Sequence, residues 1–291
     1  MTVNQARTCI ITGSNSGIGK SAAIQLAAKG LRVVLACRNL EQAEAVCTRI
    51  QNETGNSQVF SRRVDLSLVA DAMRFAKEFT GEFGTLDVLI NNAADFDLSR
   101  KQPLITAEGN EAQFATNLLA PFVLTQELLP LLRQSTDSRI INISTQGLAV
   151  YPNITFCFDD LRREKTYSPA KTYYQTKLGL LMLSLAWRER LAGSTVSVHA
   201  IRVTNVKIDM ARYANISPVL KAMYRVKSLF SIPPDKMAQT YTALATGKKP
   251  EHFYYSEKLR EVRCNKSAYD PDMQQLLWRL CEGTMTAIPH E

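Results

Sequence analysis

Short apolar runs alternate with longer stretches of helical periodicity along this chain of 291 residues. Runs rich in β-branched residues predict buried strands, whereas apolar positions three and four apart predict helices with one buried face. The pattern predicts strands over residues 7–12, 31–36, 58–63, 86–91, 139–144, 195–203 and 253–255. It predicts helices over residues 18–29, 40–53, 68–83, 111–133 and 173–191.

This alternation of strands and helices predicts an α/β fold with one doubly wound parallel sheet. The strands are almost continuously apolar, which is typical of a sheet covered by helices on both faces. Right-handed crossovers between parallel strands then give a Rossmann-like architecture. No internal repeat, low-complexity linker or change of composition interrupts the pattern, so we expect a single domain over residues 1–291.

A glycine-rich turn joins the first predicted strand to the first predicted helix. Its three glycines lack Cβ atoms, so they permit a tight turn and let a pyrophosphate approach the backbone. The helix that follows points its N-terminal amides at the same place. The sequence therefore predicts a dinucleotide site formed by Gly13, Ser14, Asn15, Ser16, Gly17, Ile18 and Gly19.

The spacing G-x-x-x-G-x-G, preceded by threonine, resembles the short-chain dehydrogenase/reductase family, and further motifs follow in the same order. They are Asp65-Leu66 after the third strand, Asn91-Asn92-Ala93 at the end of the fourth, Q-F-A-T-N over residues 113–117, and Y-x-x-x-K from Tyr173 to Lys177. The resemblance covers about residues 7–285. It implies a single dinucleotide-binding domain that interconverts carbonyls and alcohols.

Several local motifs are similar to those of retinol-dehydrogenase-like members of the family and of the WW-domain oxidoreductases. They are A-C-R-N over residues 36–39, F-D-D-L over 158–161, Y-S-P over 167–169 and L-L-W over 276–278. This similarity implies a small lipophilic partner: a retinal/retinol-like, aldehyde, ketone or quinone substrate.

The end of the second strand discriminates between the two nicotinamide cofactors. A carboxylate there would bind the ribose 2′-OH of NADH, whereas this chain has Cys37 followed by Arg38. A guanidinium binds a 2′-phosphate bidentately, so we expect NADP(H). If Arg38 does not bind the phosphate, Asn15 or Asn39 is the alternative. The resemblance implies further cofactor contacts from Asn39, Asp65, Leu66, Asn92, Ala93, Tyr173, Lys177 and the backbone of Val206.

Reduction of a carbonyl needs a proton donor and a hydrogen-bond donor to the developing oxyanion. Tyr173 and Lys177 stand four residues apart and so share a helical face. A nearby ammonium lowers the pKa of a phenol, so this pair is the expected proton donor. Tyr167 and Lys171 have the same spacing, but Pro169 between them disfavours a helix at residue 168.

Two further catalytic residues come from the resemblance. Thr145 ends the fifth strand at the position of the family's second, catalytic serine, and it keeps the hydroxyl. Ser144 is the alternative, although neighbouring strand side chains point to opposite faces. In the family's mechanism the asparagine at the position of Asn117 supports a water chain to the lysine.

The chain departs from the family pattern at several positions. Ala94 replaces a glycine after N-N-A, Val203-Thr204 replaces Pro-Gly after the sixth strand, and Ile208 replaces a threonine. A non-catalytic NADP(H)-binding sensor or scaffold on the same fold is therefore the alternative function.

Residues 205–232 are expected to form a substrate lid. Apolar residues recur at helical spacing within residues 216–230, with lysine and arginine mostly opposite them. A lid over an apolar pocket is one interpretation, and a basic amphipathic helix resting on a membrane surface is the other.

The net charge of the chain indicates which class of partner it can bind. There are 35 Lys+Arg against 27 Asp+Glu, a net charge of +8 that is dispersed along the chain. This argues against a nucleic-acid partner and suits an anionic small ligand.

No apolar run reaches ~18 residues and the first residues are polar, so neither a membrane span nor a signal peptide is expected. Six cysteines without a C-x-x-C pair indicate reduced thiols and a cytoplasmic protein. The three histidines have no metal-ligand spacing, so no metal is expected, and a monomer and a homodimer both remain open.

Overall fold

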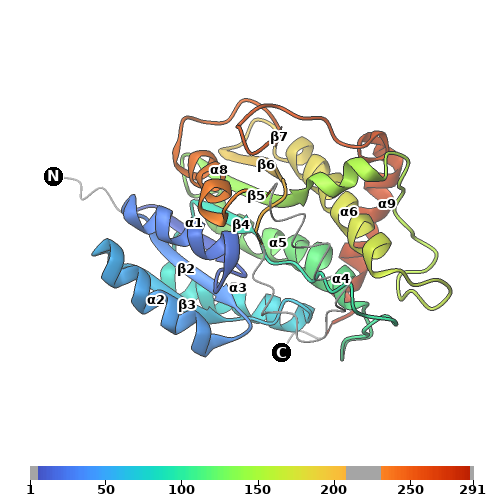
Figure 1. The fold of residues 1–291 in the computed structure, drawn as a ribbon, viewed down its shortest axis with the longest axis horizontal. Coiled ribbons are helices and arrows are strands. Elements are labelled where there is room, and N and C mark those ends of the chain that lie inside the picture. The colour runs from blue at the N-terminus through green and yellow to red at the C-terminus, as the bar shows by residue number, and fades with distance from the viewer. Residues whose placement is uncertain (1–5, 208–230, 289–291) are drawn as a thin grey trace.

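A seven-stranded parallel sheet forms the centre of the protein. The structure is a computed structural model and describes residues 6–207 and 231–288. The strands lie in the order β3-β2-β1-β4-β5-β6-β7, and all their pairings are parallel. Their bounds are β1 Thr8–Thr12, β2 Arg32–Cys37, β3 Val59–Arg63, β4 Val88–Asn91, β5 Ser138–Thr145, β6 Val196–Val203 and β7 Tyr254–Tyr255. The expected doubly wound α/β fold is confirmed (Figure 1).

Helices cover both faces of the sheet. On one face lie α1 (Gly17–Ala28), α2 (Leu40–Thr54) and α8 (Pro234–Thr246). On the other lie α3 (Val69–Phe83), α5 (Ala120–Leu132), α6 (Pro169–Arg190) and α9 (Pro271–Thr286). Successive strand residues point to opposite faces of the sheet. Ile11 therefore packs against the face covered by α1, α2 and α8, and Ile10 against the face covered by α3, α5, α6 and α9. This packing fixes the strand ends rigidly between two apolar layers.

The order of the strands reverses between β1 and β4, because the chain runs outward from β1 to β3 and then returns to the other side. The connections after these two strands leave in opposite directions, which opens a crevice at the carboxyl edge of the sheet. The glycine turn and residues 92–95 both lie at this edge. The fold therefore places the predicted dinucleotide site at the switch point.

Helix α6 begins one turn earlier than predicted, at Pro169 rather than at Tyr173. Ser168 is its N-cap, with an extended backbone and a hydroxyl that accepts from the Lys171 amide at 3.4 Å. Proline is favoured at the first helical position because it needs no hydrogen-bonded amide there. Tyr167 lies before the cap, so Tyr167 and Lys171 do not share a helical face, as predicted.

The helix predicted over residues 111–133 is not uniform. It consists of α4 (Ala112–Phe114), a π-helical turn (Ala115–Leu119) that contains Asn117, and α5. Pro121 has no N–H and cannot donate the α-helical hydrogen bond to the carbonyl of Asn117. The π-turn is the local response to this missing donor, and such turns concentrate at functional sites.

Helices α8 and α9 were not among the predicted elements, although both begin with a recognisable signal. Each has proline at its first position, followed by aspartate at Asp235 or Asp272. Proline at N1 and a carboxylate in the first turn are both favourable at a helix N-terminus. The predicted lid over residues 205–232 lies largely outside the described residues.

The helical stretch Ala112–Leu132 bears on the expectation that no segment spans a membrane. By length and composition it could cross a membrane, with a mean hydropathy of 1.2 in its most apolar window, but 78% of that window is buried inside the protein. It forms part of the core against α3 and α6.

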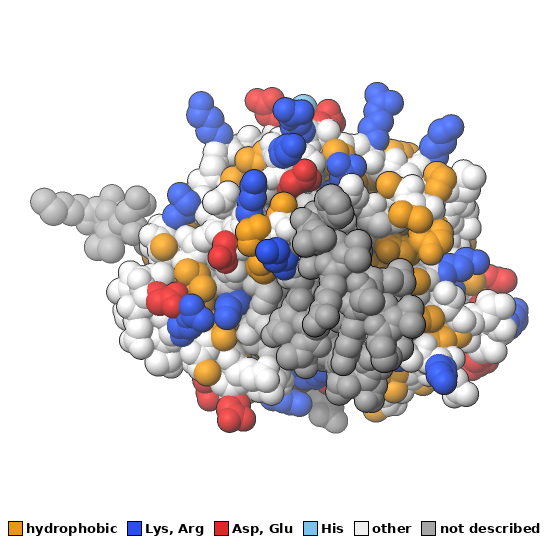
Figure 2. Space-filling model, in the orientation of Figure 1, with side chains coloured by type: hydrophobic (Ala, Val, Ile, Leu, Met, Phe, Trp, Pro, Cys, Tyr) orange, Lys and Arg blue, Asp and Glu red, His pale blue; other side chains and the backbone are white. Residues whose placement is uncertain are grey.

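The charged side chains of the surface are dispersed, as the sequence indicates. Figure 2 shows lysine and arginine side chains spread around the visible face with acidic ones among them.

Candidate active site

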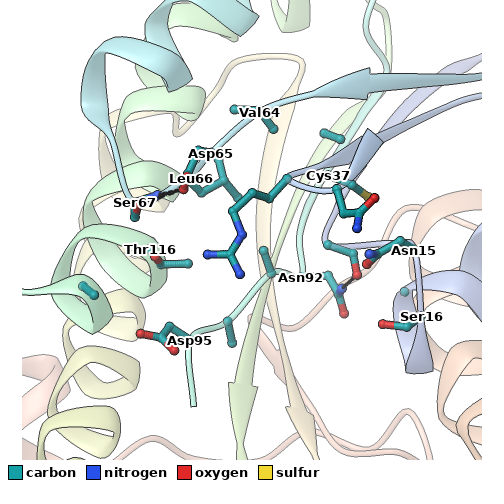
Figure 3. A pocket seen from close by; sticks show the side chains of 18 of the residues that line it. Asn15, Ser16, Cys37, Val64, Asp65, Leu66, Ser67, Asn92, Asp95 and Thr116 are labelled. Carbon is teal, nitrogen blue, oxygen red and sulfur yellow. Dashed lines mark hydrogen bonds between the residues drawn. The ribbon is translucent and has the colours of Figure 1, made fainter. Parts of the chain in front are cut away.

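A cleft of about 970 Å³ runs along the carboxyl ends of β1, β2, β3 and β4. Figure 3 shows side chains from all four strand ends converging on it. Most of the predicted cofactor residues line this cleft: Gly13, Asn15, Ser16, Gly17, Ile18, Gly19, Arg38, Asn39, Asp65, Leu66, Asn92 and Ala93. The sequence motifs and the hollow of the molecule therefore coincide.

The glycine turn is shaped so closely that side chains would not fit. Gly13 has φ +63, and a Cβ there would lie 2.9 Å from Cα of Ala93. A Cβ on Gly19 would lie 2.6 Å from Nδ2 of Asn92 and 2.8 Å from the Gly13 carbonyl oxygen. Ser16, the N-cap of α1, makes no side-chain hydrogen bond to the helix in the described chain, so the first-turn amides remain for a ligand. This cradle fits the pyrophosphate of a dinucleotide.

The end of β2 offers a positive charge to this cleft. Arg38 is exposed there, immediately before α2. Asn39 is the N-cap of α2, and its side chain accepts from the Gln42 amide at 2.9 Å. Asn15 donates to the Gln42 side chain at 3.0 Å. Burial raises the pKa of the Cys37 thiol, so this position is neutral where a carboxylate would repel a phosphate.

The ends of β3 and β4 complete the cleft. The Asp65 carboxylate accepts from the amide and the hydroxyl of Ser67, at 3.0 and 2.7 Å. Across the cleft, Oγ1 of Thr12 accepts from the amides of Asn92 and Ala93, both at 3.0 Å. The threonine before the glycine turn thus ties β1 to the N-N-A segment and fixes the floor of the cleft.

Lys177 lies inside the protein below Tyr173. Its side chain is 2% exposed, Nζ donates to the Ile143 carbonyl at 2.9 Å, and Nζ is 5.8 Å from the centre of the Tyr173 ring. Burial lowers the pKa of Lys177 to about 7. Helix α6 therefore places the phenol of Tyr173 next to the amine of Lys177, whose pKa lies near neutrality.

Thr145 is the last residue of β5, two residues after the carbonyl that holds Lys177. Its Oγ1 accepts from the Gly147 amide at 3.1 Å, which leaves its own proton to donate. Ser144 is buried on the opposite face, where its hydroxyl lies beside the Tyr254 phenol. The alternation of strand side chains thus separates the two candidate hydroxyls.

Asn117 is fixed by three hydrogen bonds from its side chain. Oδ1 accepts from the Asp95 amide at 2.7 Å, and Nδ2 donates to the Asp95 carbonyl at 3.0 Å and to Oγ1 of Thr176 at 3.1 Å. The asparagine therefore joins the loop after β4 to helix α6 beside Lys177. Its side chain is occupied, so its main-chain carbonyl is the group that can take part in a water chain.

Other predicted cofactor residues lie outside the lining of the cleft. The buried Ser14 hydroxyl donates to the Ile11 carbonyl at 2.9 Å, and Val206 forms a parallel bridge with Ile232. Tyr173 and Lys177 likewise lie outside the lining, on α6 where Lys177 bonds to the carbonyl of Ile143 in β5. Thr204, which replaces the family's glycine, donates to the Gln146 side chain at 2.6 Å next to Thr145.

The loop over residues 95–106 was expected to help build the pocket, but the sequence did not single out the residues of this loop that do so. Asp95 and Arg100 form an ion pair in the wall of the cleft. The ring of Phe96 lies 4.3 Å from the ring of Tyr173, centre to centre. Their position directly after N-N-A was the available signal, because that motif ends at the reacting edge of the sheet. Over residues 6–207 and 231–288 no cluster of three His, Cys, Asp or Glu side chains could hold a metal ion.

Comparison with known proteins agrees with this geometry. The family model for short chain dehydrogenase matches residues 7–157. Retinol dehydrogenase 11 of Mus musculus is 36% identical over 243 residues, covering 83% of this chain and 74% of that protein. Retinol dehydrogenase 13 of Mus musculus is 34% identical over 278 residues, covering 94% and 81%.

Solved structures share the fold across most of the chain. A crystal structure of a putative uncharacterized protein from Mycobacterium paratuberculosis has a TM-score of 0.71 and 28% identity, covering 96% of this chain and 93% of that one. A metagenomic short-chain oxidoreductase in complex with NADP has a TM-score of 0.62 and 25% identity, covering 86% and 95%. The chain therefore belongs to the short-chain dehydrogenase family of oxidoreductases, within its retinol-dehydrogenase-like group.

Proposed function

We propose that this protein is an NADP(H)-dependent oxidoreductase that transfers hydride between the nicotinamide and a lipophilic carbonyl/alcohol pair. The observation that carries the proposal is the buried Lys177, held below Tyr173 at the end of the strand that Thr145 terminates. The relatives named retinol dehydrogenases support a retinal/retinol-like, aldehyde, ketone or quinone substrate.

The side chains divide the proton chemistry of carbonyl reduction between them. Bound NADPH supplies the hydride to the carbonyl carbon. Tyr173 donates its proton to the carbonyl oxygen, and the Lys177 ammonium behind its ring stabilises the phenolate that remains. Thr145 donates a hydrogen bond to the same oxygen while negative charge develops on it. Alcohol oxidation uses the same groups in reverse.

Return of the proton to Tyr173 uses Lys177 and Asn117. The lysine, with its pKa lowered to about 7, exchanges protons readily at neutral pH. The Asn117 carbonyl, deprived of its α-helical donor by Pro121, is the group that holds a water next to this lysine.

The preference for NADP(H) rests on Arg38. Its guanidinium and the N-terminus of α2 both favour a 2′-phosphate bound at the end of β2. The metagenomic relative bound to NADP supports this choice.

A turnover screen with one matched pair of variants tests the function. NADPH consumption is followed with retinal, aliphatic aldehydes, aromatic ketones and quinones, with binding of NADPH measured separately by fluorescence titration. We expect turnover with at least one class, loss of it in Tyr173→Phe with NADPH affinity within a few-fold, and nearly unchanged turnover in Tyr167→Phe.

The outcomes separate the two candidate functions. NADPH binding without turnover on any class supports the sensor or scaffold instead. Loss of activity in Tyr167→Phe but not in Tyr173→Phe would show that the acid is assigned to the wrong tyrosine.

A further inference from the structure

Tyr241 is a fully buried polar side chain that belongs to no sequence motif. It lies on α8 with 0% exposure, among the apolar side chains between α1, α8 and the sheet. A buried phenol needs a hydrogen-bond partner, because leaving its hydroxyl unpaired costs desolvation free energy. Its hydroxyl donates to Oδ1 of Asn92 at 3.2 Å, across 149 positions of sequence.

Asn92 connects this phenol to the glycine turn. Its Nδ2 donates to the carbonyls of Thr12 and Gly13, at 2.9 and 3.2 Å. The same Nδ2 lies 2.6 Å from the place where a Cβ on Gly19 would be. The amide is thus wedged between the first and the last glycine of the turn.

The phenol and the two carbonyls together fix which way this amide points. An amide carries one acceptor end and one donor end, and only the donor end can face two carbonyl oxygens. Tyr241 donates to Oδ1 on one side while Nδ2 donates to Thr12 and Gly13 on the other, so the hydroxyl reinforces this orientation. Without the hydroxyl, Oδ1 loses this donor, and only the two bonds from Nδ2 still hold the amide in place.

We propose that Tyr241 is a positioning residue for the dinucleotide: its hydroxyl orients Asn92, which holds the glycine turn in the shape that receives the pyrophosphate. Gly13, Gly19 and Asn92 all line the cleft, so a displaced amide acts directly on its wall. This inference rests on the proposed cofactor binding.

Tyr241 remains a donor throughout the reaction. Burial holds its pKa well above 10, and negative charge on the neighbouring Tyr173 raises it further. The phenol therefore stays protonated while Tyr173 gives up its proton.

The test compares two tyrosines that lose the same atom. Tyr255 lies in the same apolar layer, is 5% exposed, and its hydroxyl accepts from the His252 amide at 2.7 Å, away from the cleft. We expect Tyr241→Phe to raise the Kd for NADPH by about 5- to 20-fold, as loss of one buried hydrogen bond does. Tyr255→Phe should change it by less than about 2-fold. Both variants keep the ring, so both should remain folded.

A double-mutant cycle shows whether the effect passes through Asn92. In an Asn92→Ala background, Tyr241→Phe should add less than about 2-fold to the Kd, because the amide it orients is gone. The KM for the cofactor should rise in Tyr241→Phe while kcat falls less than about 3-fold, since the reacting groups are untouched.

Two results would overturn the inference. One is a wild type that binds cofactor while Tyr241→Phe and Tyr255→Phe show equal affinities. The other is a lower melting temperature in Tyr241→Phe with an unchanged Kd, which would make the hydroxyl merely structural. A wild type that binds neither NADPH nor NADH would instead refute the proposed function, and this inference with it.

Discussion

At the scale of single residues, the site depends on where one hydroxyl points. Thr145 and Ser144 are adjacent at the end of β5, yet their side chains point to opposite faces of the sheet, and Ser144 is buried beside Tyr254. We expect Thr145→Ala to lower kcat by about 100-fold or more, as removal of an oxyanion donor does. Thr145→Ser should keep most activity because it keeps the hydroxyl. Steady-state kinetics with Ser144→Ala as control decides this, and equal activities of the Ala and Ser variants at 145 would exclude Thr145 as the donor.

The proposed cofactor preference rests on Arg38 at the same scale. Arg38→Asp removes a charge-assisted hydrogen bond to the 2′-phosphate, so we expect NADPH binding to weaken by about 10- to 100-fold. The new carboxylate can accept from the ribose 2′-OH of NADH, so the preference should invert. Dissociation constants for both cofactors measure this.

The matched control for Arg38 is Arg49→Asp, which makes the same charge change further along α2, where Arg49 pairs with Glu53. It should leave the ratio of the two constants unchanged. A ratio that also stays unchanged in Arg38→Asp would point to Asn15 as the group that binds the phosphate. Asn39 is a weaker alternative, since its side chain already caps α2.

At the scale of elements, burial of the Lys177 side chain in α6 lowers the stability of the folded chain whenever this amine is charged. Lys177 is buried, with its pKa lowered to about 7 from 10.5 in the unfolded chain. Between these values the unfolded state binds more protons than the folded state, so stability rises with pH across this window. Below pH 7 the cost is fully present.

We therefore expect Lys177→Met to abolish turnover while raising the melting temperature at pH 6. The gain should shrink as the pH rises from 7 toward 10, because the wild-type lysine is then neutral when folded. Lys171→Met, on the exposed first turn of the same helix, should show neither effect. Calorimetry across pH measures this, and a gain that does not depend on pH would contradict it.

Sequence periodicity predicted most elements because each central strand is buried on both faces, and each helix on one face, along its whole length. The apolar pattern of these segments is therefore regular. Periodicity failed where tertiary contacts decide. The π-turn around Asn117 follows from Pro121 within an otherwise helical pattern, and the outward extension of α6 follows from the Ser168 cap. Helices α8 and α9 were missed although each starts with Pro-Asp.

The candidate site divides in the same way. Motif residues such as Gly13, Arg38 and Asn92 line the cleft as predicted, because they sit at strand ends that the fold must bring together. Phe96 and Tyr241 were not predicted, because their places depend on a loop and on a helix far away in sequence. Local spacing carries no information about such contacts.

At the scale of the whole molecule, the cleft spans the ends of four strands, so a cofactor bound there would contact several elements at once. Helix α8 adds to this, because Asp235 accepts from Ser21 and Thr242 donates to Gln25, which fastens it to α1. We therefore expect ligand binding at the cleft to raise the free energy of unfolding of the whole chain rather than the stability of one loop.

Ligand binding to the folded state alone should stabilise the entire chain. At a concentration 100 times its Kd, NADPH adds about 2.7 kcal/mol to the free energy of unfolding. For a chain of 291 residues this corresponds to a rise in melting temperature of about 4 °C. NADH at the same concentration should give a smaller shift, because it lacks the 2′-phosphate that we propose Arg38 binds, and the order should reverse in Arg38→Asp. Thermal denaturation with each cofactor measures both shifts, and equal shifts in the wild type would refute selection for the 2′-phosphate.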